Sequence, residues 1–238
     1  MSLLSCAFRS KKKHPKFQLV DLFREKTPSS LIQLDEIVEI DKFAEELAKP
    51  IVSYQRIQVL SWNGVPSCIR PKIWKYLLKE MLINDAEQTL TKKRNEYAKL
   101  IGNYWRPSAF TEEERKIYHT IDVDVKRIGL EYGALCRCET VTLALKRLLF
   151  IWHNRHPASG YVQGMCDISL PFLAVFLGEY LPLDEQTLSF RVGPENLTAE
   201  TLEAVEADVY WCVSKMIEAV TSNYTQGFDG LRHAYSRV

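Results

Sequence analysis

Apolar residues recur at three- and four-residue spacing along most of the chain, which is the pattern of helices that bury one face. This pattern predicts helices over residues 31–47, 67–82, 90–104, 138–153, 167–181 and 202–220. Pro50 is expected to end the first helix, Pro71 to lie in the first turn of the second, and Pro157 to stop the fourth. The fifth is almost wholly apolar and is predicted to be a central buried helix, whereas the polar third is expected on the surface.

One segment, residues 111–128, fits more than one structure. Thr111 followed by acidic residues is typical of the N-terminus of a helix. Further along, Ile121, Val123 and Val125 alternate with charged residues. Alternation over so few residues fits either a strand or the end of a helix entering a loop, and both interpretations stay open.

The fold class is predicted to be all-α, a multi-helix domain, because strand signals are few and no repeat is evident. The turn-rich residues 182–200 are expected to form a long surface loop. With 238 residues, 46% of them hydrophobic, the chain can bury the core of one domain or at most two. We expect a flexible basic arm over residues 1–30, a helical lead-in over 31–57 and one helical domain over 58–238.

The charge balance and the cysteines restrict the class of function. Thirty-one basic residues against thirty acidic ones leave a net charge of +1, without the positive field that binding to a nucleic-acid backbone requires, so we expect no nucleic-acid partner. The six cysteines include no C-x-x-C pair and no clustered histidines, which predicts free thiols in a reducing compartment and no metal site. The first residues are the reverse of a secretory signal, and no apolar stretch is long enough to span a bilayer. A cytoplasmic location is therefore expected.

The basic cluster of the N-terminal arm, within residues 9–16, has two interpretations. A solvated tail is the ordinary one. The alternative is weak contact with an anionic membrane or an adaptor, with Cys6 beside the cluster as a site for palmitate.

Several self-contained chemistries are absent from the sequence. Neither glycine-rich phosphate loop, G-x-G-x-x-G or G-x-x-x-x-G-K-[ST], is present, so we expect no nucleotide bound by the chain itself. The G-x-S-x-G and H-E-x-x-H motifs are also missing, which disfavours a hydrolase.

Three short motifs stand out from this background. They are "RPKIW" (70–74), "IDVDVKR" (121–127) and "YVQG" (161–164). In this order, with helical segments between them, they resemble the signatures R-x-x-x-W, I-x-x-D-x-x-R and Y-x-Q of the TBC domain, a family that activates GTP hydrolysis by Rab-type small GTPases. The stretches "LSWNGVP", "RLLFIWHNRHPASGYVQGM" and "NYTQGF" are also similar to that domain, and the second is most similar to the subgroup called family member twenty-two.

The resemblance implies an all-α TBC-like fold and a GTPase activator that acts in trans. Arg127 then corresponds to an arginine finger that neutralises charge on the transferring phosphoryl group, an effect of about a thousandfold to a hundred-thousandfold in rate. Gln163 corresponds to a second finger that orients the attacking water, since an amide both donates and accepts hydrogen bonds. The partner implied is a GTP-bound Rab that carries its own GTP and Mg²⁺, with no cofactor on this chain. The location implied is cytoplasmic, peripheral on vesicle or Golgi membranes.

The other motif residues are expected to support the fingers. Trp74 is expected in the core and Arg70 to brace a nearby loop, with Ile121, Asp124, Tyr161 and Gly164 completing the motifs. Asp124 is expected to hold a nearby backbone or arginine. For Tyr161, anchoring of its loop and contact with the GTPase stay open.

The chain departs from the family pattern in two places. Ile128 and Gly129 follow Arg127, where the family often has a hydroxyl residue and a nearby proline. The chain also ends soon after "NYTQGF", so we expect the C-terminal part of the domain to be absent. Two alternatives to an activator therefore remain, a non-catalytic adaptor that binds a GTPase or another protein, and a helical scaffold whose motif residues are structural.

Overall fold

The computed structural model describes residues 34–78, 85–131, 135, 138–181, 183–184, 189–190, 193 and 196–220. The chain divides into two compact units, one up to Arg70 and one from Pro71 onward. The N-terminal arm 1–30, the predicted apolar positions Met81 and Leu82, "NYTQGF" and the C-terminal end all lie outside the described residues.

The described part of the first unit contains helices α2 (Leu34–Leu47) and α3 (Tyr54–Leu60), which pack on each other. The helix predicted over 31–47 is α2, while α3 was not predicted because seven residues are too few for a clear apolar period. Ser53 caps α3 by accepting a hydrogen bond from the Arg56 N–H at 3.3 Å. After α3, Gly64 adopts a φ of +122° in the "SWNGVP" turn, a conformation that favours glycine.

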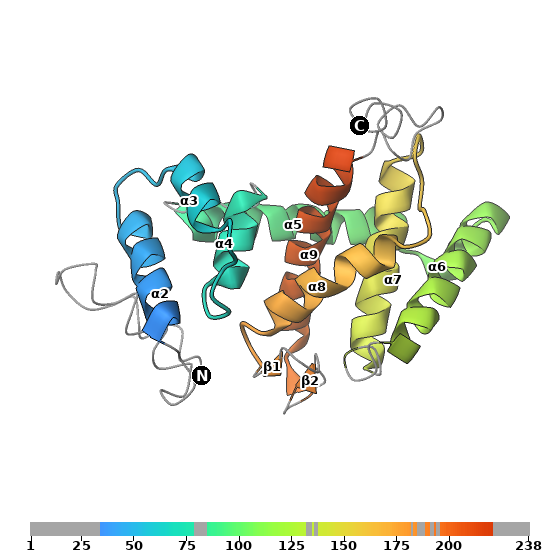
Figure 1. Cartoon of the computed structure of the whole chain (residues 1–238). Coiled ribbons are helices and arrows are strands. Elements are labelled where there is room, and N and C mark those ends of the chain that lie inside the picture. Colours follow the sequence, from blue (N-terminus) through green and yellow to red (C-terminus); the bar gives the residue numbers. More distant parts are fainter. Residues whose placement is uncertain are drawn as a thin grey trace, which may run out of the picture. The chain divides into compact units, whose positions relative to one another are not determined.

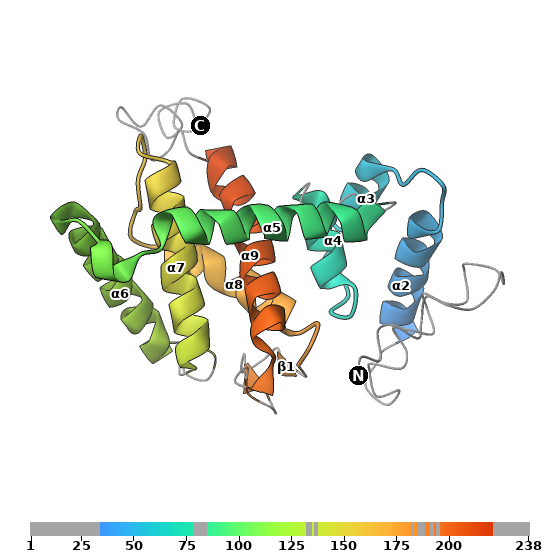
Figure 2. The ribbon, with the colours of Figure 1, turned by 180° about the vertical axis from the view of Figure 1, so that it is seen from behind.

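The described part of the second unit contains further helices. These are α4 (Arg70–Leu77, whose first residue belongs to the first unit), α5 (Ala86–Tyr104), α6 (Glu112–Glu131), α7 (Glu139–Arg155), α8 (Met165–Leu177) and α9 (Ala199–Val220), with a short 3₁₀ helix η2 (Pro107–Ala109). Helix α7 packs against α6, α8 and α9, and α8 packs along α9 (Figure 1). Seen from behind, α5 runs across α7 and α9 (Figure 2).

Residues 111–128 form neither a strand nor the frayed end of a helix, because α6 is continuous from Glu112 to Glu131. Thr111 and Glu114 form a capping box: the Glu114 N–H donates to Thr111 Oγ1 at 3.2 Å, and the Thr111 N–H donates to the Glu114 carboxylate at 2.7 Å. Ile121 and Val125 are buried one turn apart, whereas Val123 is 52% exposed. The short alternation of apolar and charged residues therefore belongs to a helix, in which Ile121 and Val125 face the core and Val123 does not.

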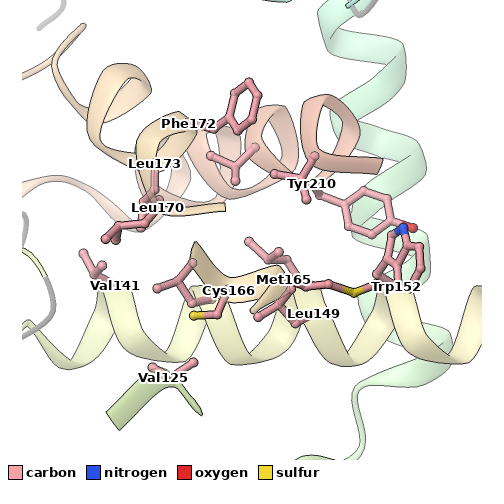
Figure 3. Packing of buried hydrophobic residues seen from close by; sticks show 14 of the residues in the cluster. Val125, Val141, Leu149, Trp152, Met165, Cys166, Leu170, Phe172, Leu173 and Tyr210 are labelled. Carbon is pink, nitrogen blue, oxygen red and sulfur yellow. The ribbon is translucent and has the colours of Figure 1, made fainter. Parts of the chain in front are cut away.

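The core of the second unit surrounds α8, which confirms the prediction of a central buried helix. Met165, Leu170, Leu173 and other α8 residues pack among side chains from α6, α7 and α9 (Figure 3). On α7, residues 148–152 are all buried, so this helix is covered on most of its circumference. A core packed from four helices fixes the position of each helix end, including those that carry the motif residues.

Helix α5 lies at the surface, as its polar sequence predicted, and one side of it also contacts α9. Tyr97 is 1% exposed, and its hydroxyl donates to the Glu206 carboxylate of α9 at 2.6 Å. Arg94 binds Asp208 of α9 through two hydrogen bonds of 2.8 and 2.7 Å. These polar contacts satisfy the buried carboxylates of α9, and apolar spacing cannot reveal them.

Residues 182–200, predicted as a surface loop, contain a small antiparallel pair of strands, β1 (Leu183–Asp184) and β2 (Ser189–Phe190). Apart from this pair, the regular elements in the described part of the chain are helices, so the all-α prediction is confirmed. Of the helices described, none is both long enough and apolar enough to cross a bilayer.

Candidate functional site

Helix α6 presents Asp124 and Arg127 on the same face, one turn apart. Arg127 donates from Nε and Nη2 to Asp124 Oδ1, at 3.2 and 3.1 Å. The Asp124 side chain is 2% exposed and the Arg127 side chain 42%. Ile121, the first residue of this motif, is fully buried and anchors this part of α6 in the core. The buried carboxylate of Asp124 thus binds the guanidinium of Arg127, which is partly exposed at the surface.

The loop between α7 and α8 carries the third motif. His153 of α7 accepts a hydrogen bond at Nδ1 from the Tyr161 N–H at 2.9 Å, which ties the loop back to its own helix. Gly160 makes this approach possible, because it has a φ of +62° and a Cβ there would lie 3.2 Å from His153 Nδ1. Burial lowers the pKa of His153, which favours the neutral ring that this acceptor role requires.

Asp124 joins this loop to α6, because its two carboxylate oxygens face different motifs. Oδ1 accepts from Arg127, while Oδ2 accepts from the Tyr161 hydroxyl at 2.5 Å and from the Gly164 N–H at 3.0 Å. Gly164 has a φ of +95° and immediately precedes α8. A single buried carboxylate therefore fixes the spacing between the arginine of α6 and the turn that contains Gln163.

The ionisation of this carboxylate follows from its contacts. Burial opposes the charged form of Asp124, but the hydrogen bonds from Gly164, Tyr161 and Arg127 outweigh it and lower the pKa of Asp124. Burial and the neighbouring Asp124 carboxylate raise the pKa of the Tyr161 hydroxyl, which remains a donor. At neutral pH the site therefore holds an aspartate, a phenol and a guanidinium.

Gln163 occupies the turn just before Gly164, and its side chain is exposed. It thus lies one residue from the Gly164 N–H that binds Asp124. The contacts of Asp124 thus join the second motif on α6 to the third motif in the 161–164 loop.

The first motif makes contacts that support its own helix and the turn before it. Trp74 packs edge-on against Phe172 of α8, with ring centroids 5.2 Å apart, and is partly buried. Arg70 donates from Nε to the Val65 carbonyl at 3.0 Å, in the turn that precedes α4. Both contacts are structural.

Sequence reasoning missed a further residue of the site, Asp167. It lies in the first turn of α8, and its Oδ2 accepts from Arg127 Nη2 at 2.9 Å. An acidic residue in the first turn of a helix is common, because it complements the positive end of the helix dipole. Its position four residues after Gln163 was the only available signal, and that spacing alone does not distinguish it from an ordinary capping acid.

The described part of the chain brings together no group of three or more potential metal ligands. The site instead consists of one cation held between two carboxylates beside an exposed amide. It can therefore bind an anion through Arg127 and position a polar ligand through Gln163.

A mainly helical unit that carries the three motifs in order, with the second and third joined through Asp124, agrees with the class of protein that the family comparison gives. The chain belongs to the Rab-GTPase-TBC domain family, whose family model matches residues 67–238.

Named relatives agree with this assignment. The chain is 37% identical to "TBC1 domain family member 22A" of Macaca fascicularis over 86% of this chain and 40% of that protein. It is 37% identical to "GTPase-activating protein gyp1" of Schizosaccharomyces pombe, over 85% of this chain and 39% of that protein. Relatives of the member-22 subgroup were expected from the central string, and this prediction is confirmed. The chain spans about two fifths of the length of these relatives.

A solved structure shares the fold. The crystal structure of the Ypt/Rab-GAP domain of Gyp1p matches with a TM-score of 0.70 and 32% identity, over 83% of this chain and 62% of that one. This match supports the helical architecture described here.

Proposed function

We propose that this chain accelerates GTP hydrolysis by a Rab-type small GTPase in its GTP-bound state. Family membership supports this proposal, as does the similarity to relatives named GTPase-activating proteins. The observation that carries it is the shared carboxylate of Asp124, which links the α6 arginine to the loop of Gln163. Both candidate fingers lie at the surface, where a partner can reach them.

In this proposal Arg127 contacts the γ-phosphoryl group of the GTP. A guanidinium keeps its charge at every physiological pH and can contact two phosphate oxygens, so it stabilises the charge that spreads over those oxygens in the transition state. The carboxylates beside it raise the pKa of Arg127 further. Because α6 and Asp124 hold the guanidinium in advance, less orientational freedom is lost when the complex forms.

Gln163 orients the attacking water in the same scheme. Its amide can accept a hydrogen bond from the water and donate one to a neighbouring oxygen. Tyr161 and Gly164 are both bound to Asp124, which supports this role because the backbone of the turn that carries Gln163 is tied to the carboxylate that also binds Arg127. The GTP and Mg²⁺ are carried by the GTPase, and the two side chains complete an active site that the partner supplies in part.

Single-turnover hydrolysis across a panel of GTP-loaded Rab proteins tests the proposal. We expect Arg127→Ala to lower the accelerated rate by about a thousandfold, and Gln163→Ala by about a hundredfold or more. Arg115→Ala is a matched control, because Arg115 is an exposed arginine of the same helix, about 18 Å away at 1.5 Å per residue.

The outcomes separate the proposal from its rivals. Acceleration by the parent chain that collapses in both finger variants but persists in Arg115→Ala supports the mechanism. A folded parent chain that binds GTP-loaded Rab without acceleration would point to an adaptor. If the finger variants lose stability while turnover is unchanged, the motif residues are structural.

A further inference from the structure

Asp167 places a second carboxylate on Arg127, and its environment differs from that of Asp124. Asp124 is 2% exposed, and its two oxygens are bonded to α6 and to the 161–164 loop. Asp167 is 38% exposed, comparable to the 42% of Arg127, and it reaches the guanidinium from α8. The first contact is part of the packed structure, whereas the second is an ion pair at the surface.

Because the two carboxylates differ in exposure, we expect the Asp124 contacts to stay formed more of the time than the ion pair with Asp167. Breaking the Asp124 contacts leaves a buried charge without its partners, which is strongly unfavourable. Exposed ion pairs are weak because water and salt screen both charges, so the pair with Asp167 can open without disturbing the fold. Arg127 can therefore turn away from Asp167 while Asp124 still holds its Nε.

Asp167 also opposes an incoming anion. Its carboxylate binds Nη2, one of the nitrogens that a phosphate oxygen would use, and lies in the first turn of α8, where its charge offsets the positive end of the helix dipole. Gln163 is in the turn just before this helix, so a phosphoryl group that contacts both Arg127 and Gln163 approaches the same carboxylate.

We propose that Asp167 restrains Arg127 in the free protein and competes with phosphate oxygens for its guanidinium. This inference rests on the proposed function. Asp167 is a positioning residue in this scheme: it holds the guanidinium extended at the site in the absence of a ligand, and gives it up when a GTP-loaded partner arrives. The restraint lowers the rate at limiting activator concentration.

Asp167→Asn removes the charge and retains the size of the side chain. We expect kcat/KM for GTP hydrolysis to rise by about two- to fivefold at low ionic strength, which is the range set by an exposed ion pair. The gain should fall toward onefold in about 1 M salt, where the screening length is about 3 Å. Glu113→Gln is the control, since it makes the same charge change on an exposed residue of α6 about 21 Å from Arg127 along the helix.

A double-mutant cycle distinguishes competition at Arg127 from a general change in charge. In the Arg127→Ala background, Asp167→Asn should leave residual hydrolysis unchanged, because the group that it restrains is absent. A fall in kcat/KM for the single variant, or an equal rise in Glu113→Gln, would overturn the proposal. A rise that persists without Arg127 would overturn it as well.

Nuclear magnetic resonance on the free chain tests the restraint without any GTPase. The ¹⁵Nη–¹H signal of Arg127, assigned by its loss in Arg127→Lys, should shift in Asp167→Asn and exchange faster with solvent, because Asp167 binds Nη2. An unchanged signal refutes the restraint, whatever the kinetics show. If the chain accelerates no GTPase while this signal responds to Asp167→Asn, the proposed function fails and the ion-pair restraint stands.

Discussion

Replacement of Asp124 by asparagine should destabilise the protein, because the carboxylate accepts hydrogen bonds on both oxygens in a buried position. An amide has the same size but carries a donor in place of one acceptor. If Nδ2 faces Gly164, two N–H donors oppose each other. If it faces Arg127, the charge-assisted contacts are lost instead. Neither orientation satisfies all the partners.

The magnitude follows from that mismatch. A buried donor left without an acceptor costs about 1–3 kcal/mol, so we expect the free energy of unfolding to fall by about 1–3 kcal/mol in Asp124→Asn. Urea denaturation followed by circular dichroism measures this difference from the shift in midpoint at unchanged slope. Asp122→Asn is a matched control on the same helix, where the carboxylate pairs with Lys126 and Lys146 nearer the surface. There we expect less than about 1 kcal/mol.

The pH dependence gives a second check. Hydrogen bonds keep the pKa of Asp124 below its unfolded value of about 3.9, so its contribution is complete above that pH and is lost as the pH falls through the folded pKa. The stability difference between the parent and Asp124→Asn should therefore narrow below about pH 4. Two results would refute the role of Asp124 in joining α6 to the 161–164 loop. One is an Asp124→Asn variant that unfolds at the same urea concentration as Asp122→Asn. The other is a difference in unfolding free energy between the parent and Asp124→Asn that does not change at acid pH.

Three further predictions concern the loop and the α5–α9 contact. Gly160→Ala should lower the free energy of unfolding in urea by about 1–3 kcal/mol, because φ is +62° and the new methyl group would crowd His153. Gly102→Ala lies within α5 with open space around it, so there we expect a gain of about 0.5–1 kcal/mol. Burial lowers the pKa of His153, so the free energy of unfolding should decline as the pH falls below about 6.5. His153→Gln should flatten that part of the pH profile, and an unchanged slope would show that His153 is not the group responsible. Tyr97→Phe should cost about 0.5–1.5 kcal/mol through the lost bond to Glu206, and no change in midpoint would contradict this.

The helices of the second unit could be predicted because each buries one face. Spacing located α4, α5, α7, α8 and α9 apart from their exact ends, and the apolar run 167–181 identified the buried α8. Apolar spacing does not identify an element that is short or rich in charged residues. Helix α3 is too brief to show a period, and α6 was ambiguous because charged residues alternate with β-branched ones over a single turn.

The candidate site was found from the motifs and their resemblance to a family rather than from physical pattern alone. Once α6 is known to be a helix, the three-residue step places Asp124 and Arg127 on one face. It did not reveal Asp167 or His153, because an acid in the first turn and a histidine near the end of a helix are ordinary in any helical protein.

The sequence by itself determined the helical class, the order of the long helices other than α6, and the residues that carry the three motifs. Only the tertiary structure decided that Asp124 binds both Arg127 and the loop of Gln163, and that Asp167 reaches the same guanidinium from α8. The reason is physical: apolar spacing records which face of a helix is buried, a local property. The meeting of residues 37 to 40 positions apart depends on how α6, α7 and α8 pack around a shared core.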